Sequence, residues 1–323
     1  MKNKIFIPTV AVAVALVAGV VFPKIVTSPT VLSLMVQAIA YAIGTLGVSF
    51  LIRQNGQVSF GHALYYGLST YLIALISKYV GISLGVSIVA VIALSGIFAF
   101  LIGLIIVRTP GIAFAMVTLA IGQVFYLLVS QARSLTGGAD GLIVDIPSTI
   151  YGLKSSVYAK PSSMFVVSWF VLVLVVYGVY LLLNTRFGPL TEAIKENEER
   201  TRFIGYKTVV PRAVVYAVSA MLCTVAGSLS TLYTAFVSPE SLHWSLSGSF
   251  LIAAILGGSS MITGSVIGAI VYFVLRDVLI YETSHWLSIL GISLILVIVY
   301  WPDGISGGLR VGAAKLKMAF GRK

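Results

Sequence analysis

Charge is scarce in this sequence, and acidic residues are the scarcest charged type. Asp, Glu, Lys and Arg make up 10% of the 323 residues, with 10 acidic against 21 basic residues, whereas a soluble domain carries about 25% charged residues. Hydrophobic residues make up 59%. The composition predicts a polytopic integral membrane protein. The net charge of +11 does not require a nucleic-acid partner, because basic residues collect in the cytoplasmic loops of membrane proteins.

Cysteine and histidine are also rare. The single Cys223 excludes a disulfide framework and a cysteine metal site. The three histidines, His62, His243 and His285, are too scattered to predict a metal site. The sequence contains no GxxxxGK[ST] loop, no GxGxxG after a strand and no HExxH. We therefore expect this chain to hold no catalytic residues, no metal and no cofactor.

What the sequence has in abundance is apolar segments. A transmembrane helix needs about 20 apolar residues, so we predict one all-α transmembrane domain over 1–323, a bundle of about eight to ten spans that includes short or re-entrant helices. Residues 1–22 resemble a signal peptide without a clear cleavage site, and we expect them to remain as the first span. The apolar segments are 5–22, 31–52, 60–77, 82–107, 112–131, 162–183, 213–236, 245–256, 265–280 and 285–301.

Basic residues predict the orientation. With the N-terminus inside, fifteen basic residues fall on the cytoplasmic side and six outside, as the positive-inside rule requires. The cytoplasmic side then receives a central loop, 184–212, and a basic tail, 302–323. The exterior receives the loop 134–161, in which we expect a short helix against the outer face. Asp140 and Asp145 of this loop are either solvated or contacts for an external partner.

The central loop is the only long polar interval and holds four of the ten acidic residues. Gly188 and Pro189 predict a helix start, and Gly205 fits a left-handed helix end. Glu196–Arg200 and Glu198–Arg202 have the spacing of helical ion pairs. One apolar face of this predicted helix would comprise Leu190, Ile194, Asn197, Thr201 and Ile204. A solvated helix and a helix on lipid headgroups are alternatives, but the density of acids favours a protein partner.

Small residues predict helix contacts and a chain break. Ser95, Ala99 and Gly103 form a ridge along which a neighbouring helix can approach closely. The run from Gly257 and Gly258 to Gly264 interrupts an apolar stretch, and the tail must return inside. We therefore expect two short helices here, as two packed crossings or a re-entrant hairpin. Glycine-interrupted apolar segments mark the pathway in transporters.

Polar residues inside apolar segments are the other candidates for a translocation pathway or gate. The first group opens the third span, near the cytoplasmic edge, where a pathway role competes with interfacial capping. His62 fits a hydrogen-bonded structural residue better than a proton relay. In the fifth span, an interhelical hydrogen bond is the alternative role for Gln123. The candidates are Asn55, Gln57, Ser59, Gly61, His62, Thr118 and Gln123, together with Gly257, Gly258 and Gly264.

Several stretches resemble branched-chain amino acid ABC permeases of the LivM type, in the same order and over most of the chain. Ala193–Gly205, AIKENEERTRFIG, resembles the family's cytoplasmic coupling loop. Further matches are NGQVSFGHALYYGLSTYL at 55–72, TPGIAFAMVTLAIGQV at 109–124, LTGGADG at 135–141, FVSPES at 236–241 and ILGGSSMITGSVIGA at 255–269. Ala113-Phe114, Ser259 and His243-Trp244 depart from the family pattern, which leaves the substrate open.

The resemblance implies a permease subunit of an ABC importer, in the plasma membrane of a bacterium or archaeon. Its expected partners are a second, LivH-like permease, two cytoplasmic ATP-binding subunits that carry ATP and Mg²⁺, an external substrate-binding protein and the lipid bilayer. Branched-chain or other hydrophobic amino acids are the expected cargo. The residues expected to couple to the ATPase are Glu192, Ala193, Lys195, Glu196, Asn197, Glu198, Arg200 and Gly205.

Three alternatives remain. One is an ABC permease for urea or short amides. Another is an ion-coupled secondary transporter, which would need acidic residues within its spans, where only Asp277 and Glu282 lie near an edge. The third is a membrane enzyme, for which no convergent catalytic set is found.

Overall fold

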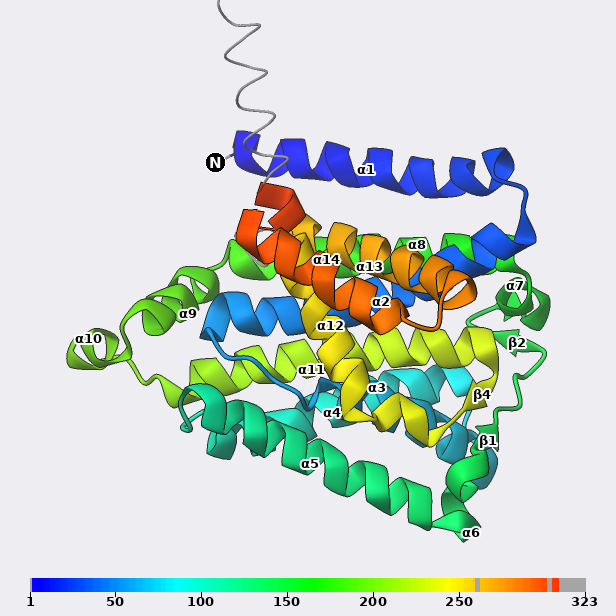
Figure 1. Ribbon diagram of the computed structural model, residues 1–323, viewed down its shortest axis with the longest axis horizontal. Helices are drawn as coiled ribbons and strands as arrows, with labels where there is room; N and C mark the ends of the chain where they lie inside the picture. The colour runs from blue at the N-terminus through cyan, green and yellow to red at the C-terminus, as the bar shows by residue number, and fades with distance from the viewer. Residues whose placement is uncertain (1, 259–261, 301–303, 308–323) are drawn as a thin grey trace, which may run out of the picture.

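A computed structural model describes residues 2–258, 262–300 and 304–307 as an all-α bundle (Figure 1). Each of the ten expected apolar segments contains a helix, which confirms the predicted fold class. Six of these helices in the described part, α2, α4, α5, α8, α11 and α13, are long and apolar enough to cross a membrane. The ten helices are α1 (Lys2–Ile25), α2 (Pro29–Asn55), α3 (His62–Leu75), α4 (Leu84–Ile106), α5 (Gly111–Gln131), α8 (Pro161–Leu183), α11 (Val209–Thr234), α12 (Trp244–Gly257), α13 (Ile262–Glu282) and α14 (Trp286–Tyr300).

Short elements fill the two polar loops and the remaining connections. The central loop contains α9 (Phe187–Glu196) and α10 (Glu198–Phe203), and a π-helical turn, η1 (Ile76–Val80), continues α3. The expected short helix of the 134–161 loop is α7 (Ser155–Ala159). The other short elements are α6 (Arg133–Thr136), η2 (Gly138–Asp140), β1 (Leu142–Ile143), β2 (Thr149–Ile150), β3 (Leu153–Lys154), β4 (Phe236–Val237) and η3 (Pro239–Leu242).

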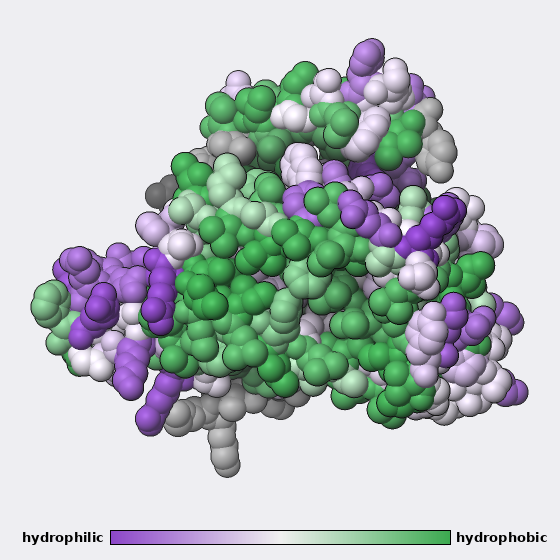
Figure 2. Space-filling view, turned by 90° about the horizontal axis from the view of Figure 1, so that it is seen from below, coloured by the Kyte–Doolittle hydropathy of each residue, from purple (hydrophilic) through white to green (hydrophobic). Residues whose placement is uncertain are grey.

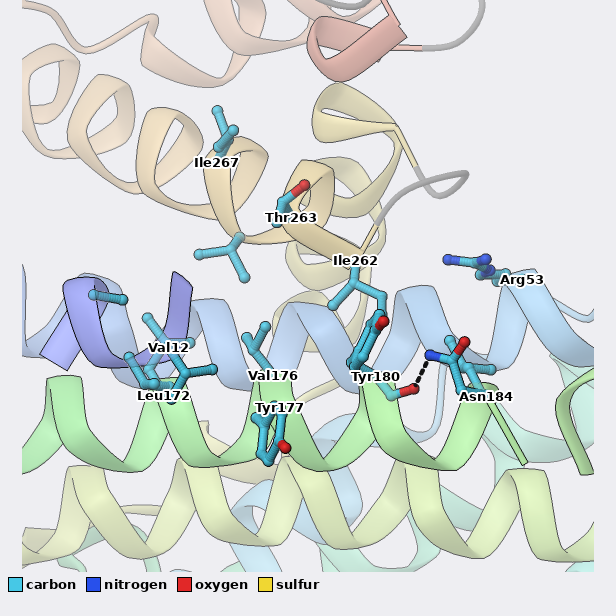
Figure 3. A pocket seen from close by; sticks show the side chains of 14 residues that line it. Val12, Arg53, Leu172, Val176, Tyr177, Tyr180, Asn184, Ile262, Thr263 and Ile267 are labelled. Carbon is cyan, nitrogen blue, oxygen red and sulfur yellow. Dashed lines mark hydrogen bonds between the residues drawn. The ribbon is translucent and has the colours of Figure 1, made fainter. Parts of the chain in front are cut away.

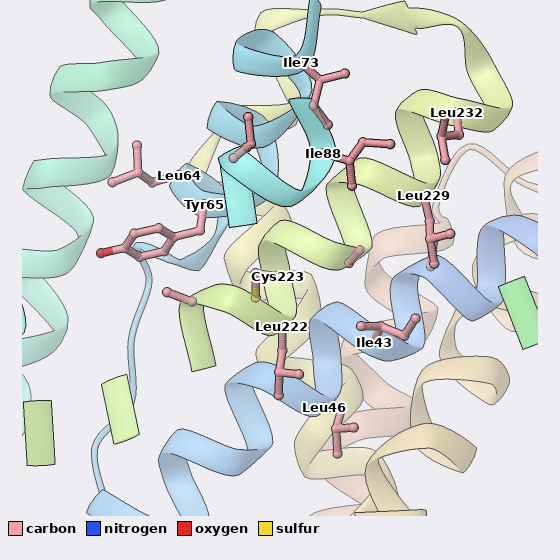
Figure 4. Close-up of a cluster of buried hydrophobic side chains, with 14 of the residues drawn as sticks. Ile43, Leu46, Leu64, Tyr65, Ile73, Ile88, Leu222, Cys223, Leu229 and Leu232 are labelled. Atoms are coloured by element: carbon pink, nitrogen blue, oxygen red, sulfur yellow. The ribbon is translucent and has the colours of Figure 1, made fainter. Parts of the chain in front are cut away.

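Helices α2 and α11 form the centre of the bundle, with α1 and α8 on one side and α4 and α5 on the other (Figure 1). Figure 4 shows Leu222 and Leu229 of α11 beside Ile43 and Leu46 of α2. All four side chains are buried. Without a hydrophobic driving force between helices in lipid, such close packing is a main source of helix association.

Small residues bring α4 and α11 together, as the sequence predicts. Ser95 and Ala99 are buried, and the Ser95 hydroxyl lies 2.8 Å from Oγ1 of Thr224. A Cβ atom on Gly103 would lie 3.3 Å from Cα of Ala213. The ridge on α4 therefore faces α11, and polar groups on both helices satisfy each other within it.

The two ends of the bundle carry different loops. At one end, Nζ of Lys195 donates to the backbone carbonyl of Arg53 (3.1 Å), which ties the central loop to the end of α2. At the other end, β1 pairs with β4 (Leu142 with Val237), so the 134–161 loop and the segment after α11 lie together. This grouping of loops matches the predicted alternation of the spans. Figure 2 shows a mostly hydrophobic middle between the hydrophilic end that carries α9 and α10 and the opposite, more polar end.

The chain after α11 continues through three helices, α12, α13 and α14, with the expected break between the first two. Helix α12 starts inside the bundle, where Ser247 accepts a hydrogen bond from the backbone N–H of Ala63 (2.7 Å). It ends near Arg53, since Arg53 and Ile262 line one groove. Helix α13 returns, and α14 brings Gly304 back against Gly258. The tail thus begins at the end that carries α9 and α10, while most of its residues lie outside the described part.

Candidate functional site

The segment between α2 and α3 enters the bundle as extended chain. Helix α2 ends at Asn55, and Gly56 adopts a left-handed φ of 67°, which stops the helix. Helix α3 begins only at His62, beside Ser219 and close to Gly47. Gly47 lies eight residues before the end of α2, a depth of about 12 Å at 1.5 Å per residue. The expected position near the edge is therefore wrong for Ser59, Gly61 and His62, which are buried inside the bundle, whereas Asn55 and Gln57 lie where α2 ends.

Hydrogen bonds to distant parts of the chain hold this irregular segment, although Asn55 Oδ1 and Gln57 Oε1 are buried without a partner among the described residues. Asn55 Nδ2 donates to the carbonyl of Arg212 (3.0 Å), and Gln57 Nε2 donates to that of Thr109 (3.0 Å). The N–H of Phe60 donates to Oγ1 of Thr118 (3.3 Å). Non-helical backbone at membrane depth persists only where protein or water satisfies it. The entering segment is therefore held on three sides, by α5, α11 and the loop between α4 and α5.

His62 is fully buried and bonded through both ring nitrogens. Its Nδ1 lies 2.8 Å from Oγ of Ser59 and its Nε2 lies 2.6 Å from Oγ of Ser219. Ser219 donates its own proton to the carbonyl of Gly47 (2.7 Å), so it must accept from Nε2–H. Nδ1 of the neutral ring then accepts from Ser59. This arrangement suits a structural latch between α3, α11 and α2, and it leaves the ring no free nitrogen for a proton relay.

Of the two pathway candidates on α5, Thr118 contacts the entering segment and Gln123 does not. Thr118 is buried and meets the entering segment, since a Cβ atom on Gly61 would lie 2.5 Å from its carbonyl oxygen. Gln123 is half-buried and makes no side-chain hydrogen bond with any described residue, so the expected interhelical hydrogen bond is not seen. The structure therefore joins Thr118, but not Gln123, to the segment that begins at Asn55.

The glycine candidates form a second cluster. A Cβ atom on Gly257 would lie 2.1 Å from the carbonyl oxygen of Gly264, so the two backbones touch. Gly258 has φ 90°, a value that L residues rarely adopt. On the neighbouring helix, Ser265 donates to Ser49 of α2 (2.5 Å). The expected break and the close packing of α12 on α13 are confirmed.

These two clusters lie on different faces of α2. Gly47 faces Ser219, whereas Ser49, two residues later, bonds Ser265. Two residues of an α-helix correspond to about 200° of rotation. The pathway candidates therefore do not converge on one site within this chain, because α2 stands between them.

The central loop contains two helices where we predict one. Asn197 has extended backbone angles, φ −156° and ψ 98°, and its Oδ1 caps α10 by accepting from the N–H of Arg200 (2.8 Å). The predicted continuous face from Leu190 to Ile204 is therefore interrupted. Pro189 is the third residue of α9 rather than the first. Gly205, with φ 96°, follows α10 as predicted.

Glu198 is not free for a partner. Its carboxylate accepts from Arg212 Nη1 (2.6 Å) and from Thr208 Oγ1 (2.7 Å). The predicted pair with Arg202 is not formed, and no pair of Glu196 with Arg200 occurs among the described residues. The exposed candidates are Glu192, Ala193, Lys195, Glu196, Asn197, Arg200 and Gly205.

Three large apolar or aromatic side chains are exposed at the tip of the loop, among charged residues. Phe203 is 91% exposed and Ile204 is 70% exposed, and Tyr206 lies beside them. In Figure 1, α10 projects beyond the ends of the membrane-length helices. These side chains therefore point away from the apolar middle of the bundle, in a place where a protein surface could cover them.

The chain matches the family model described as "Branched-chain amino acid transport system / permease component" over residues 30–300. It belongs to this permease family. The permease is 25% identical to the high-affinity branched-chain amino acid transport system permease protein LivM of Escherichia coli, over 94% of this chain and 75% of the relative. It is 25% identical to a probable LivM of Methanocaldococcus jannaschii, over 75% and 77%. No solved structure matches it.

Relatives of the permease also include import systems for another solute. The autoinducer 2 import system permease protein LsrC of Salmonella choleraesuis is 26% identical over 84% of this chain and 72% of the relative. The permease is thus a multi-pass transport subunit of a family whose members differ in cargo. Among its described residues, no group of three or more His, Cys, Asp or Glu could hold a metal ion.

Sequence reasoning about the permease missed several residues that define the site. Ser219, Ser247 and Gly47 are small residues within apolar helices, and nothing in their local pattern separates them from packing residues. Arg212 and Thr208 were available as partners of Glu198, but helical spacing favours Arg202. Phe203 offered one usable signal, an aromatic residue within an otherwise charged run.

Proposed function

We propose that this permease is one of two membrane subunits of an ATP-driven importer of branched-chain or other hydrophobic amino acids. The second subunit would be LivH-like, and two ATPase subunits would bind ATP and Mg²⁺. An external binding protein would deliver the cargo. Family membership and the similarity to the LivM permeases support this assignment.

The observation that carries the coupling part of the proposal is the exposed apolar tip of α10. Phe203 and Ile204 lie among the charged residues Arg200 and Arg202. Aromatic anchors and arginines are enriched at energetically important interface positions. In the proposed orientation, this end of the bundle faces the cytoplasm, where the ATPase subunits would dock on it.

Contacts of α9 and α10 connect the central loop rigidly to the membrane-length helices. Thr191 donates to Gln54 Oε1 at the end of α2 (2.5 Å). The ion pair of Glu198 with Arg212 fastens α10 to the start of α11. Because Asn55 also bonds the carbonyl of Arg212, a push on α10 would move α2, α11 and the entering segment together. Such rigid-body motion of packed helices is one way to alternate access.

We also test a second cargo class, because an LsrC protein has nearly the same identity to the permease as LivM has, 26% against 25%, although over a smaller share of the chain. The sparse acidic residues of the spans suit a neutral or zwitterionic solute and do not decide between the two. The discriminating experiment reconstitutes the complete transporter with its external binding protein in proteoliposomes that contain ATP. ATP-dependent uptake of leucine, isoleucine or valine is expected. Uptake without ATP, or of autoinducer 2 alone, would overturn the proposal.

A further inference from the structure

An apolar groove runs along the side of the bundle, and at Ile262 and Thr263 it borders the glycine cluster. It has a volume of about 800 Å³ and lies between α1, α8 and α13, with α2 behind it. This volume falls within the range of roughly 300–1,000 Å³ that small-molecule sites occupy. Val12, Leu172, Val176 and Ile267 are among its lining residues.

One end of the groove is polar and basic. Figure 3 shows Arg53, Asn184 and Tyr180 at this end, while Val12 and Leu172 lie at the other. Arg53 is half-buried, and it forms no ion pair within the described residues. Nζ of Lys195 lies on its backbone carbonyl, which adds a second positive charge near the same end.

The groove thus has a long apolar part and, where it reaches the polar end of the bundle, the positively charged side chain of Arg53. We propose that it binds one anionic phospholipid, such as phosphatidylglycerol, with an acyl chain along α8 and the phosphate on Arg53. Basic pockets between transmembrane helices recognise anionic headgroups. Arginine suits phosphate because its planar guanidinium can donate two parallel hydrogen bonds. A zwitterionic lipid would lack the net negative charge that this end complements.

The test uses the complete transporter, purified in neutral detergent and stripped of lipid, and titrates it with phosphatidylglycerol or phosphatidylcholine. Native mass spectrometry counts bound lipids, and thermal unfolding reports stabilisation. We expect phosphatidylglycerol to bind in preference to phosphatidylcholine. Arg53→Gln should weaken phosphatidylglycerol binding about tenfold or more, because a hydrogen bond to a charged group is lost. Arg108→Gln, an exposed arginine outside the groove, is the matched control and should bind normally.

A second pair of variants tests the channel rather than the charge. Val176→Trp fills the groove and should reduce binding of phosphatidylglycerol, whereas Leu174→Trp, on the exposed side of α8, should not. Normal gel filtration of each complex excludes misfolding. Equal binding of both lipids, or an unchanged affinity in Arg53→Gln, would overturn the proposal. So would cross-linking of position 176 to the second permease subunit. None of these results bears on cargo or ATP dependence, so the importer assignment is tested separately.

Discussion

Nε2 of His62 lies 2.6 Å from Oγ of Ser219, so the first residue of α3 is fastened to the middle of α11. The Ser219 hydroxyl donates a hydrogen bond to the carbonyl of Gly47 in α2. Three helices thus meet at one buried hydrogen-bonded chain, about 12 Å from the end of α2. The position of the entering segment depends on these hydrogen bonds.

We predict that Ser219→Ala destabilises the transporter. The substitution leaves Nε2–H of His62 buried without an acceptor, which costs about 1–3 kcal/mol. The measurement is the thermal unfolding temperature of the purified complex. Thr234→Ala, at an exposed site near the end of the same helix, should change stability by less than about 0.5 kcal/mol. Equal effects of the two variants would rule out the latch.

Gly61 and Gly122 offer a test of the close approach between the entering segment and α5. A Cβ atom on Gly61 would lie 2.5 Å from the carbonyl oxygen of Thr118, whereas one on Gly122 would lie 3.6 Å from its nearest neighbour. Gly61→Ala should therefore cost about 1–3 kcal/mol through overpacking, and Gly122→Ala should be tolerated. Denaturation of both variants in the same detergent checks this. A tolerated Gly61→Ala would show that the segment packs differently.

The Glu198–Arg212 ion pair should support coupling without acting as a docking contact. We expect Glu198→Arg to lower ATP-dependent uptake, because two like charges would then separate α10 from α11. The exchanged double variant, Glu198→Arg with Arg212→Glu, should recover part of the activity, because opposite charges face each other again. ATP-dependent uptake by proteoliposomes is measured for the unaltered transporter, the single variant and the double variant. Failure of the exchange to improve on Glu198→Arg would mean that Glu198 acts outside this pair.

Phe203 should be an energetic anchor for the ATPase. Phe203→Ala is expected to reduce co-purification of the ATPase subunit by about tenfold or more, as truncation of an interface anchor commonly does. Phe236→Ala is the matched control, because Phe236 is also exposed but lies at the opposite end of the bundle. Unchanged co-purification of the Phe203 variant would move the docking contact elsewhere on the loop.

Much of the fold follows from the sequence, because long apolar segments and glycine breaks are local signals. The break after Gly257 was predicted by the parity of the crossings, and the ridge of Ser95, Ala99 and Gly103 by side-chain size. Both features need no knowledge of distant residues beyond the requirement that membrane helices alternate in direction.

The parts that local reasoning misplaced depend on distant partners. The depth of His62 is fixed by Ser219 and Gly47, more than 150 residues and about 15 residues away along the chain. Asn197 interrupts the predicted single helix because its side chain caps α10. Glu198 bonds Arg212 at a separation of 14 residues, a contact that helical spacing does not anticipate. Tertiary contacts overrode the local pattern at each of these positions.

The most direct test of the account is photo-cross-linking in intact cells from a photoreactive amino acid placed at position 203. The account predicts an adduct between this position and the ATPase subunit. Position 143, where Ile143 is 79% exposed at the opposite end, should instead give an adduct with the external binding protein. An ATPase adduct from position 143, or none from position 203 in an active transporter, would contradict the proposed coupling site.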